Sequence, residues 1–425
     1  MSMAALVAFS GVFVLGVIFA ILGSIKLKLA EILQIDDAQV GKLFSALMFS
    51  GLIASLVIGP LTDMLGYGII AALGFALSGI SLWLLAAAIS YRSALIACLL
   101  LGIGAIGVNT GNVLGPTVLF GGQDPSRASN LLNILFGLGA LLTPLVMAFL
   151  LGRLGYKKTV AFLGLVLFVP VILPRFAELP TPGAGFDAME SMRLLANPAV
   201  LLGGMGLFCS IAIQSSLAGF VTSYLKSYEF SDEKAGALLS GFWIALILSR
   251  VVATAAPPSI APGIVLPIVT LLMAVSIALM IVTRSAFMAA LFSLLAGFFL
   301  GPIFPTLVGE SLSKTNAIGM GTAGSVFGLI FAMGLCGGIV VPTMTGKHAV
   351  RHGIRKSLRI SLGVSLVLVL IGSMFYFVPT VEADLPDDVV DEAPISAPQV
   401  HGVGLVDPDE AATVNLAPDD APPLE

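Results

Sequence analysis

Long charge-free apolar stretches recur along the body of the chain, and they limit its folds more than any other feature. No charged residue lies between Arg284 and Glu310 or between Lys314 and Lys347. Each stretch holds the roughly 20 apolar residues that a membrane-spanning helix needs. The stretches do not alternate with a period of two, as the strands of a membrane β-barrel would. The sequence therefore predicts an all-α integral membrane protein.

Cutting the chain at glycine, proline and charge clusters gives twelve predicted spans. They cover residues 4–25, 43–60, 68–90, 94–120, 129–152, 158–175, 196–222, 236–256, 262–283, 286–309, 317–343 and 357–378. The longest polar break in the body falls between the sixth and seventh spans. We therefore expect a six-helix bundle at residues 1–178, a connecting loop at 179–195 and a second six-helix bundle at 196–378.

The charge of the chain is divided unevenly. The formal net charge is −4, but residues 379–425 contain twelve Asp and Glu and no Lys or Arg, so the body carries a net charge of +8. This acidic tail is also rich in proline and alanine and has too little apolar surface to fold alone. We expect it to be disordered, and docking to a basic partner is the alternative role for it.

Two glycine–proline pairs support an internal repeat. Gly139 precedes Pro144 in the fifth span, and Gly337 precedes Pro342 at the same spacing in the eleventh. Both spans are the fifth of their half. Small residues let helices approach closely in lipid, and proline loosens local backbone hydrogen bonding. The shared position favours a true repeat over the general use of Gly and Pro in membrane helices.

A specific motif lies between the second and third spans, where the chain reads Gly59-Pro-Leu-Thr-Asp63-Met-Leu-Gly66. It resembles the loop motif G-x-L-x-D-x-x-G-R-K of the major facilitator superfamily. The resemblance implies a twelve-helix fold in two pseudo-repeated bundles and a cytoplasmic loop that acts as a conformational latch. Tyr67 and Gly68 stand where the motif has its basic residues, so the expected charge network is incomplete.

Further segments resemble the fucose-permease-like sugar symporters of that superfamily. They are Leu132–Pro144, Gly241–Arg250 and Gly301–Thr306. In the fucose-type pattern an acidic residue is expected near Asn109 and an amide near Asn112, and this chain has amides at both positions. The resemblance implies proton-linked sugar symport.

Polar residues inside spans are costly and are functional candidates for that reason. Asn109 and Asn112 are three residues apart, so they share a helix face. Asn133, Gln214 and Trp243 could complete a midplane cavity, with the amides bonding sugar hydroxyls and the indole stacking on a sugar ring. Ser215 is a further polar neighbour. Hydrogen bonding between helices is the alternative role for each of them.

Two charged residues lie close to predicted span ends. Arg250 lies near the end of the eighth span, where a snorkelling structural role is favoured over a role in solute binding. Glu310 follows the tenth span, and Lys314 lies four residues further on, at the spacing of a helical ion pair. Glu310 is also the candidate for proton coupling, because no other acid lies near a span interior.

The residues together predict a secondary transporter that moves a small polar solute, sugar-like in the first instance, by alternating access. An organic-anion or drug carrier and a non-transporting scaffold or receptor remain as alternatives. An enzyme is not expected, since the spans lack HExxH, a carboxylate pair and a Ser/His arrangement. No Walker motif occurs, and Cys98, Cys209 and Cys336 lie singly in apolar runs. No cofactor, metal or nucleic-acid partner is predicted.

The orientation in the membrane is predicted differently by two arguments. Fifteen of the 20 Lys and Arg fall in connections after odd-numbered spans and five in the others, which by the positive-inside rule would put both termini outside. The family resemblance puts both termini in the cytoplasm, and the long connection and the acidic tail then face the cytoplasm too. We expect a multi-pass protein of the cell (inner) membrane with cytoplasmic termini.

Overall fold

The computed structural model describes residues 2–180, 193–257 and 260–380, and within these ranges the chain contains helices and no strand. Eleven helical stretches are long and apolar enough to cross a membrane. The longest, Pro125–Phe176, leaves the helical conformation at Gly155 (φ 71°, ψ 172°) and so contains the fifth and sixth predicted spans. With that break, the predicted all-α fold with twelve spans matches the described helices.

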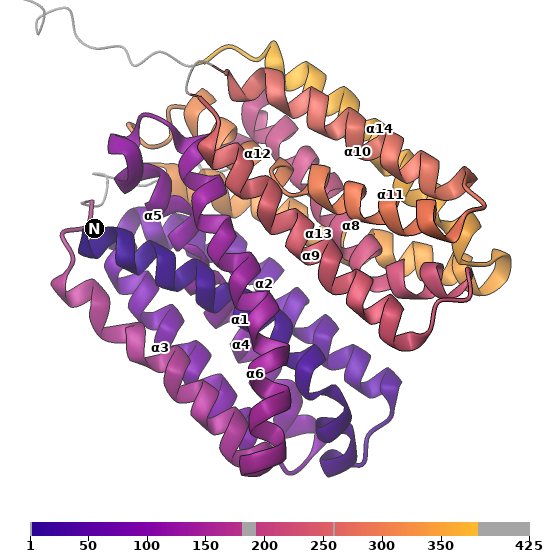
Figure 1. Cartoon of the computed structure of the whole chain (residues 1–425). Helices are drawn as coiled ribbons and strands as arrows, with labels where there is room; N and C mark the ends of the chain where they lie inside the picture. Colours follow the sequence, from indigo (N-terminus) through magenta and orange to yellow (C-terminus); the bar gives the residue numbers. More distant parts are fainter. Residues whose placement is uncertain (1, 181–192, 258–259, 381–425) are drawn as a thin grey trace, which may run out of the picture. The chain divides into compact units, whose positions relative to one another are not determined.

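The helices form two halves that pack against each other (Figure 1). The first half consists of α1 (Met3–Leu33), α2 (Asp37–Leu65), α3 (Tyr67–Ala86), α4 (Tyr91–Asn109), α5 (Gly111–Val118), η1 (Leu119–Gly122), α6 (Pro125–Phe168) and η2 (Val169–Phe176). The second half consists of η3 (Leu194–Ala196), α8 (Pro198–Lys226), α9 (Asp232–Ala255), α10 (Pro262–Val282), α11 (Ala286–Leu300), α12 (Ile303–Lys314), α13 (Ala323–His352) and α14 (Ile354–Tyr376). The acidic tail, and residues 181–192 of the connecting loop, lie outside the described residues.

Helix boundaries differ from the predicted spans where polar residues continue or interrupt a helix. Helix α1 runs to Leu33, past the predicted end at residue 25, because hydropathy marks the apolar part of a helix and not its last turn. At the eleventh span the prediction was too long, because it placed the start of the helix at residue 317. Helix α13 begins at Ala323, since Asn316 and Gly321 have positive φ angles of 49° and 69° and hold the chain in turns.

The fourth membrane span of each half is broken near its centre. In the first half α4 ends at Asn109 and α5 begins at Gly111. In the second half α11 ends at Leu300, and α12 begins at Ile303 after Gly301 and Pro302. Interrupted helices in membranes are tolerated where the freed backbone groups find other partners. At the second break the Gly301 carbonyl oxygen accepts from Arg250 Nε at 2.9 Å, and at the first the backbone of α1 lies close, since a Cβ atom on Gly111 would be 2.7 Å from the Ala8 carbonyl oxygen.

Equivalent glycines fix the packing inside each half. A Cβ atom on Gly139 of α6 would lie 2.3 Å from the Phe13 carbonyl oxygen of α1, and one on Gly337 of α13 would lie 2.1 Å from the Phe208 carbonyl oxygen of α8. Both contacts join the fifth span of a half to its first span. Only a glycine allows backbones to approach this closely. The same packing thus occurs twice in one chain.

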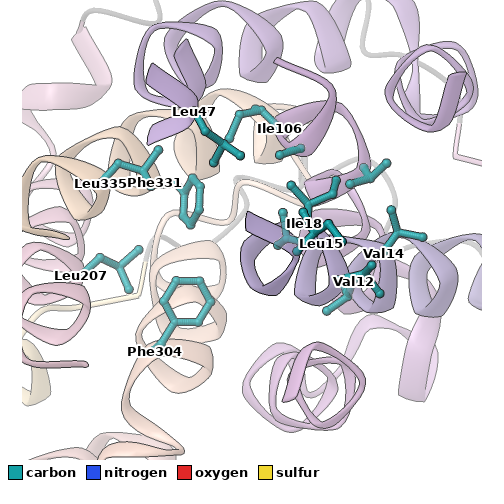
Figure 2. Close-up of a cluster of buried hydrophobic side chains, with 14 of the residues drawn as sticks. Val12, Val14, Leu15, Ile18, Leu47, Ile106, Leu207, Phe304, Phe331 and Leu335 are labelled. Atoms are coloured by element: carbon teal, nitrogen blue, oxygen red, sulfur yellow. The ribbon is translucent and has the colours of Figure 1, made fainter. Parts of the chain in front are cut away.

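Large apolar side chains line the space between the two halves. The rings of Phe304 and Phe331, with centroids 6.1 Å apart, lie across from Leu15 and Ile18 in the buried cluster (Figure 2). Leu15 and Ile18 come from α1, whereas Phe304 and Phe331 come from α12 and α13. The core of the protein is therefore shared between the halves, with side chains contributed by α1, α12 and α13.

Candidate solute-binding cavity

A cavity of about 130 Å³ lies between the two halves, next to this apolar core. Its polar lining residues are Asn112, Asn133, Gln214, Ser215 and Arg250. The remaining lining residues, apart from Gly338, are large and apolar: Leu15, Phe19, Met48, Phe136, Ile211, Phe304, Phe331 and Leu335. A small set of polar groups in a mainly apolar wall is the usual composition of a small-molecule site.

Three asparagines form one chain of hydrogen bonds beside the cavity. The Asn112 side chain donates from Nδ2 to Asn109 Oδ1 at 2.7 Å, and Asn133 donates from Nδ2 to Asn112 Oδ1 at 2.8 Å. Asn133 Nδ2 also donates to the Ser129 carbonyl oxygen at 2.9 Å. Asn109 is fully buried behind Asn112, at the break between α4 and α5. The chain of amides therefore stabilises that break and brings Asn112 and Asn133 to the cavity wall.

Arg250 crosses from the second half to the first. Its Nη1 donates to the Asn133 carbonyl oxygen at 2.6 Å, and its Nε donates to the Gly301 carbonyl oxygen, at the break between α11 and α12, at 2.9 Å. The side chain is 2% exposed. The prediction that Arg250 snorkels to the membrane surface is wrong, because α6 and the α11–α12 break cover it and give its N–H groups partners inside the protein.

The predicted site residues separate into three groups in the structure. Asn112, Asn133 and Gln214 line the cavity, together with Ser215, and Asn109 lies one layer behind them. Trp243 is not among the described lining residues; its ring packs edge-on against Phe242, with centroids 5.8 Å apart. Sequence reasoning missed the aromatic wall. Phe304 is the second residue of α12, just after a helix break that the Gly301–Pro302 pair could have indicated.

Asp63 joins the end of α2 to the start of α13. Its Oδ1 accepts from Gly324 N at 2.7 Å, and its Oδ2 accepts from Ser325 N at 2.7 Å and from Ser325 Oγ at 2.5 Å. The carboxylate thus satisfies unpaired N–H groups at a helix N-terminus, where the helix dipole favours negative charge. Gly66 has φ 85° and lets α3 start immediately after α2. The loop motif fastens one half to the other.

Glycine also brings α2 and α13 into close contact beside Asp63. A Cβ atom on Gly59 would lie 2.5 Å from the Gly324 carbonyl oxygen, and one on Gly328 would lie 2.5 Å from the Ser55 carbonyl oxygen. The Ser55 hydroxyl donates to the Gly328 carbonyl oxygen at 2.8 Å. The first glycine of the loop motif therefore sets the distance at which the halves close on this side.

Further bonds between the halves lie near the same end. Ser126 Oγ donates to Glu310 Oε1 at 3.2 Å, Asn130 Nδ2 donates to Thr306 Oγ1 at 3.1 Å, and Arg127 Nε donates to the Thr254 carbonyl oxygen at 2.8 Å. Helix α6 begins at this end, whereas α9 and α12 end there. Among the described residues, the hydrogen bonds between the halves thus lie at the cavity or on its Asp63 side.

Glu310 does not pair with Lys314 as its helical spacing indicated. Lys314 Nζ donates to the Val378 carbonyl oxygen at 2.6 Å, and no described salt bridge joins the two side chains. Glu310 instead faces Ser126 and lines a second cavity of about 450 Å³, together with Asp124 and Arg127. The spacing prediction fails because the Lys314 side chain is directed to the end of α14, where its Nζ bonds to Val378 and lies 6.0 Å from the centre of the Phe375 ring.

No group of three or more His, Cys, Asp or Glu that could hold a metal ion occurs among the described residues. Cys98 and Cys209 are buried, and the three cysteines are free. The polar groups of the central cavity are amides, a hydroxyl and a guanidinium, which suit hydrogen bonding to an organic solute and not metal ligation.

The fold is similar to those of solved transporters. A variant of the E. coli fucose:proton symporter FucP matches with a TM-score of 0.70 and 17% identity, over 88% of this chain and 99% of that chain. FucP in the outward conformation gives 0.68 and 19%, with the same coverages. The human organic anion transporter MFSD10 (TETRAN) gives 0.69 and 16%, over 87% and 99%.

Sequence comparison gives the family. No curated protein sequence matches the chain. The model of the Major Facilitator Superfamily matches residues 7–342, which covers most of the helical body, including the loop motif, the amide chain and Arg250. The chain is therefore a multi-pass membrane protein that belongs to the Major Facilitator Superfamily, with the fold of its transporters.

Proposed function

We propose that this protein is a secondary transporter that moves a small polar solute through the central cavity by alternating access. The observation that carries the proposal is the position of Asn112, Asn133 and Gln214, which come from both halves and line one cavity. The Asp63 contact and the Ser126–Glu310 bond close one side of that cavity, as one end state of alternating access requires.

A sugar-like solute is the first candidate for this cavity. Amide side chains offer both donors and acceptors to hydroxyl groups, and the fold resembles that of the fucose:proton symporter FucP. An organic anion is the second candidate, because Arg250 is a buried cation in the cavity wall.

Counterflow exchange in proteoliposomes tests transport without assuming an energy source. The purified full chain should exchange labelled solute from a panel of sugars, organic acids and drugs. Gln214→Leu should weaken exchange at least tenfold, because it removes a cavity amide. Gln123→Leu, which changes an amide in the second cavity, is the matched control and should exchange normally. Exchange of no solute by the well-folded protein would favour the scaffold or receptor alternative.

We further propose that transport is linked to protons and that Glu310 carries the coupling. This side chain lies between the halves, bonded to Ser126 of the opposite half, so its protonation would remove charge from that interface. Glu310→Gln should abolish accumulation driven by a proton gradient and leave counterflow intact. Asp124→Asn is the control, since it neutralises another acid of the same cavity and Asn still caps α6. Gradient-driven accumulation by Glu310→Gln would contradict the role of Glu310.

The location in the cell (inner) membrane with cytoplasmic termini, and the two-bundle boundaries at 178 and 196, are parts of the same proposal. They are supported by the family and by the loop motif. A basic partner for the acidic tail remains a prediction from the sequence.

A further inference from the structure

Arg250 carries a buried charge that no acid in the described part of the chain neutralises. Its two hydrogen bonds go to the backbone carbonyl oxygens of Asn133 and Gly301. No described Asp or Glu forms a salt bridge with it, and no acid lines the cavity. Carbonyl dipoles offset a guanidinium charge only in part, and a buried cation without a counter-ion is unfavourable. The cavity therefore has a positive wall that an anion would complete.

The other polar groups of the cavity also favour an anion. Both N–H groups of the Asn133 amide are already used, on Asn112 and on the Ser129 carbonyl oxygen. Gln214 and Ser215 form no hydrogen bond with other described residues, and both line the cavity. Most groups left for a solute are donors: the remaining guanidinium N–H groups, the second N–H of Asn112, the Gln214 amide and the Ser215 hydroxyl can all donate to a carboxylate, and Asn133 Oδ1 remains as an acceptor.

The rest of the wall is apolar and limits the solute. Phe136, Phe304 and Phe331 are among the lining residues. A neutral sugar carries hydroxyl groups around the edge of its ring, and those that find no partner among the few polar groups of the cavity would lose water without gaining hydrogen bonds. The volume of about 130 Å³ is close to that of a roughly 150 Å³ protein cavity known to hold one benzene molecule. The solute should therefore be no larger than a single ring or a short chain.

We propose that the solute is a small monocarboxylate with an apolar body, its carboxylate bound by Arg250 and assisted by Gln214 or Ser215. The inference rests on the proposed transport function and chooses between its two candidate solute classes. Arginine matches a carboxylate with two parallel N–H donors, and the apolar body would lie against the aromatic side of the cavity.

The rival explanation is that Arg250 only ties α9 to α6 and to the helix break at Gly301. The chain offers a matched control for this, because Arg127 makes the same kind of bond between the same two helices, from α6 to the Thr254 carbonyl oxygen of α9. Arg127 lines the second cavity and not the central one. A purely structural role for Arg250 predicts that both arginines behave alike toward solutes.

The test compares each acid with its neutral isostere on the purified full chain. Benzoate and butanoate are set against benzamide and butanamide, and against the neutral sugar fucose, by ligand-induced shift of the melting temperature and by counterflow in proteoliposomes. We expect the acids to bind about 10 to 100 times more tightly than the amides, the factor that a charge-assisted hydrogen bond supplies. Equal binding of acid and amide, or no binding of either acid, would overturn the proposal.

Variants then assign the preference to one side chain. Arg250→Gln should remove the preference for acids, Arg250→Lys should keep part of it, and Arg127→Gln should keep all of it. If Arg250→Gln fails to fold, the ratio of acid affinity to amide affinity in Arg250→Lys still tests the role of Arg250. A ratio that is unchanged in the folded Arg250 variants would contradict that role.

The solute panel separates this proposal from the transport function on which it rests. Exchange of fucose without exchange of acids would overturn the monocarboxylate proposal and leave the transport function intact. Exchange of no solute would overturn both.

Discussion

Asp63 and Ser325 form the shortest hydrogen bond between the two halves that the structure records at the loop motif. Ser325 donates to the same carboxylate oxygen of Asp63 from its hydroxyl at 2.5 Å and from its backbone N at 2.7 Å. Asp63 lies at the end of the second span and Ser325 in the first turn of the eleventh. The carboxylate therefore acts as a helix cap supplied by the opposite half, which couples the cap to closure of the halves.

Replacing Asp63 by Asn should weaken closure on this side. The amide brings no negative charge to the α13 N-terminus, and its NH2 group cannot accept the hydrogen bonds that one of the two carboxylate oxygens accepts now. The loss should be about 1 kcal/mol, or roughly fivefold in the closed population. Closure is measured by thiol labelling of Thr306→Cys, because Thr306 lies between the halves and is only 5% exposed. A thiol reagent added from the Asp63 side should label it about five times faster when Asp63 is replaced.

The control for this prediction is Asp36→Asn. Asp36 caps the other end of α2, where its side chain accepts from Gln39 N at 2.7 Å, and Asn is an equally good cap. This variant should label at the parent rate. An unchanged rate in Asp63→Asn would mean that the carboxylate cap does not hold the halves together.

Gly139→Ala and Gly337→Ala should each destabilise the protein. The added methyl group would lie 2.3 or 2.1 Å from a backbone carbonyl oxygen, so the helices must separate, at a cost of about 1–3 kcal/mol. Melting of the purified variants in one detergent measures the loss. Gly152→Ala is the matched control on α6, because nothing lies within 4 Å of its Cβ position. It should be neutral or up to about 1 kcal/mol more stable, since alanine favours helix more than glycine does. Equal melting of all three variants would rule out close packing at the two glycines.

The sequence was sufficient for features that depend on local composition or on a strict motif. Charge-free length predicted the spans because lipid forces helices. The repeat at Gly139 and Gly337 could be recognised in the sequence because equivalent positions in the two halves need the same small residue. The fused fifth and sixth spans were separated correctly, since the polar residues near Gly155 interrupt the apolar pattern.

Features that depend on which helices pack against each other could not be predicted from the sequence. Arg250 lies five residues before the end of α9, and only the packing of α6 and the Gly301 break over it shows that it is buried. The i,i+4 spacing placed Lys314 near Glu310, but the lysine bonds to Val378, which is far along the chain. Aromatic side chains occur in most predicted spans, and some of them, such as Phe49 and Phe287, are exposed, so composition alone does not separate Phe304 and Phe331 from those that face lipid.

Truncation after Pro379 should leave membrane insertion and counterflow unchanged. The described cavity residues and the described contacts between the halves lie before that position, and Val378, whose carbonyl oxygen accepts from Lys314, is kept. Uptake by the truncated chain should equal that of the full chain after correction for the amount of protein in the membrane. Loss of counterflow in a well-expressed truncation would show that the acidic tail takes part in transport.

Thiol labelling of two cysteines can decide the orientation of the chain in the membrane. With cytoplasmic termini, Ser396→Cys should resist an impermeant thiol reagent added to intact cells. Ile89→Cys, in the connection between α3 and α4, should react, since Ile89 is 86% exposed and an odd number of spans precedes it. The parent chain gives the background of Cys98, Cys209 and Cys336. The distribution of Lys and Arg predicts the reverse pattern, because it would put both termini outside and this connection in the cytoplasm. Reaction of Ser396→Cys together with protection of Ile89→Cys would therefore contradict the cytoplasmic termini and place the Asp63 contact on the outer side.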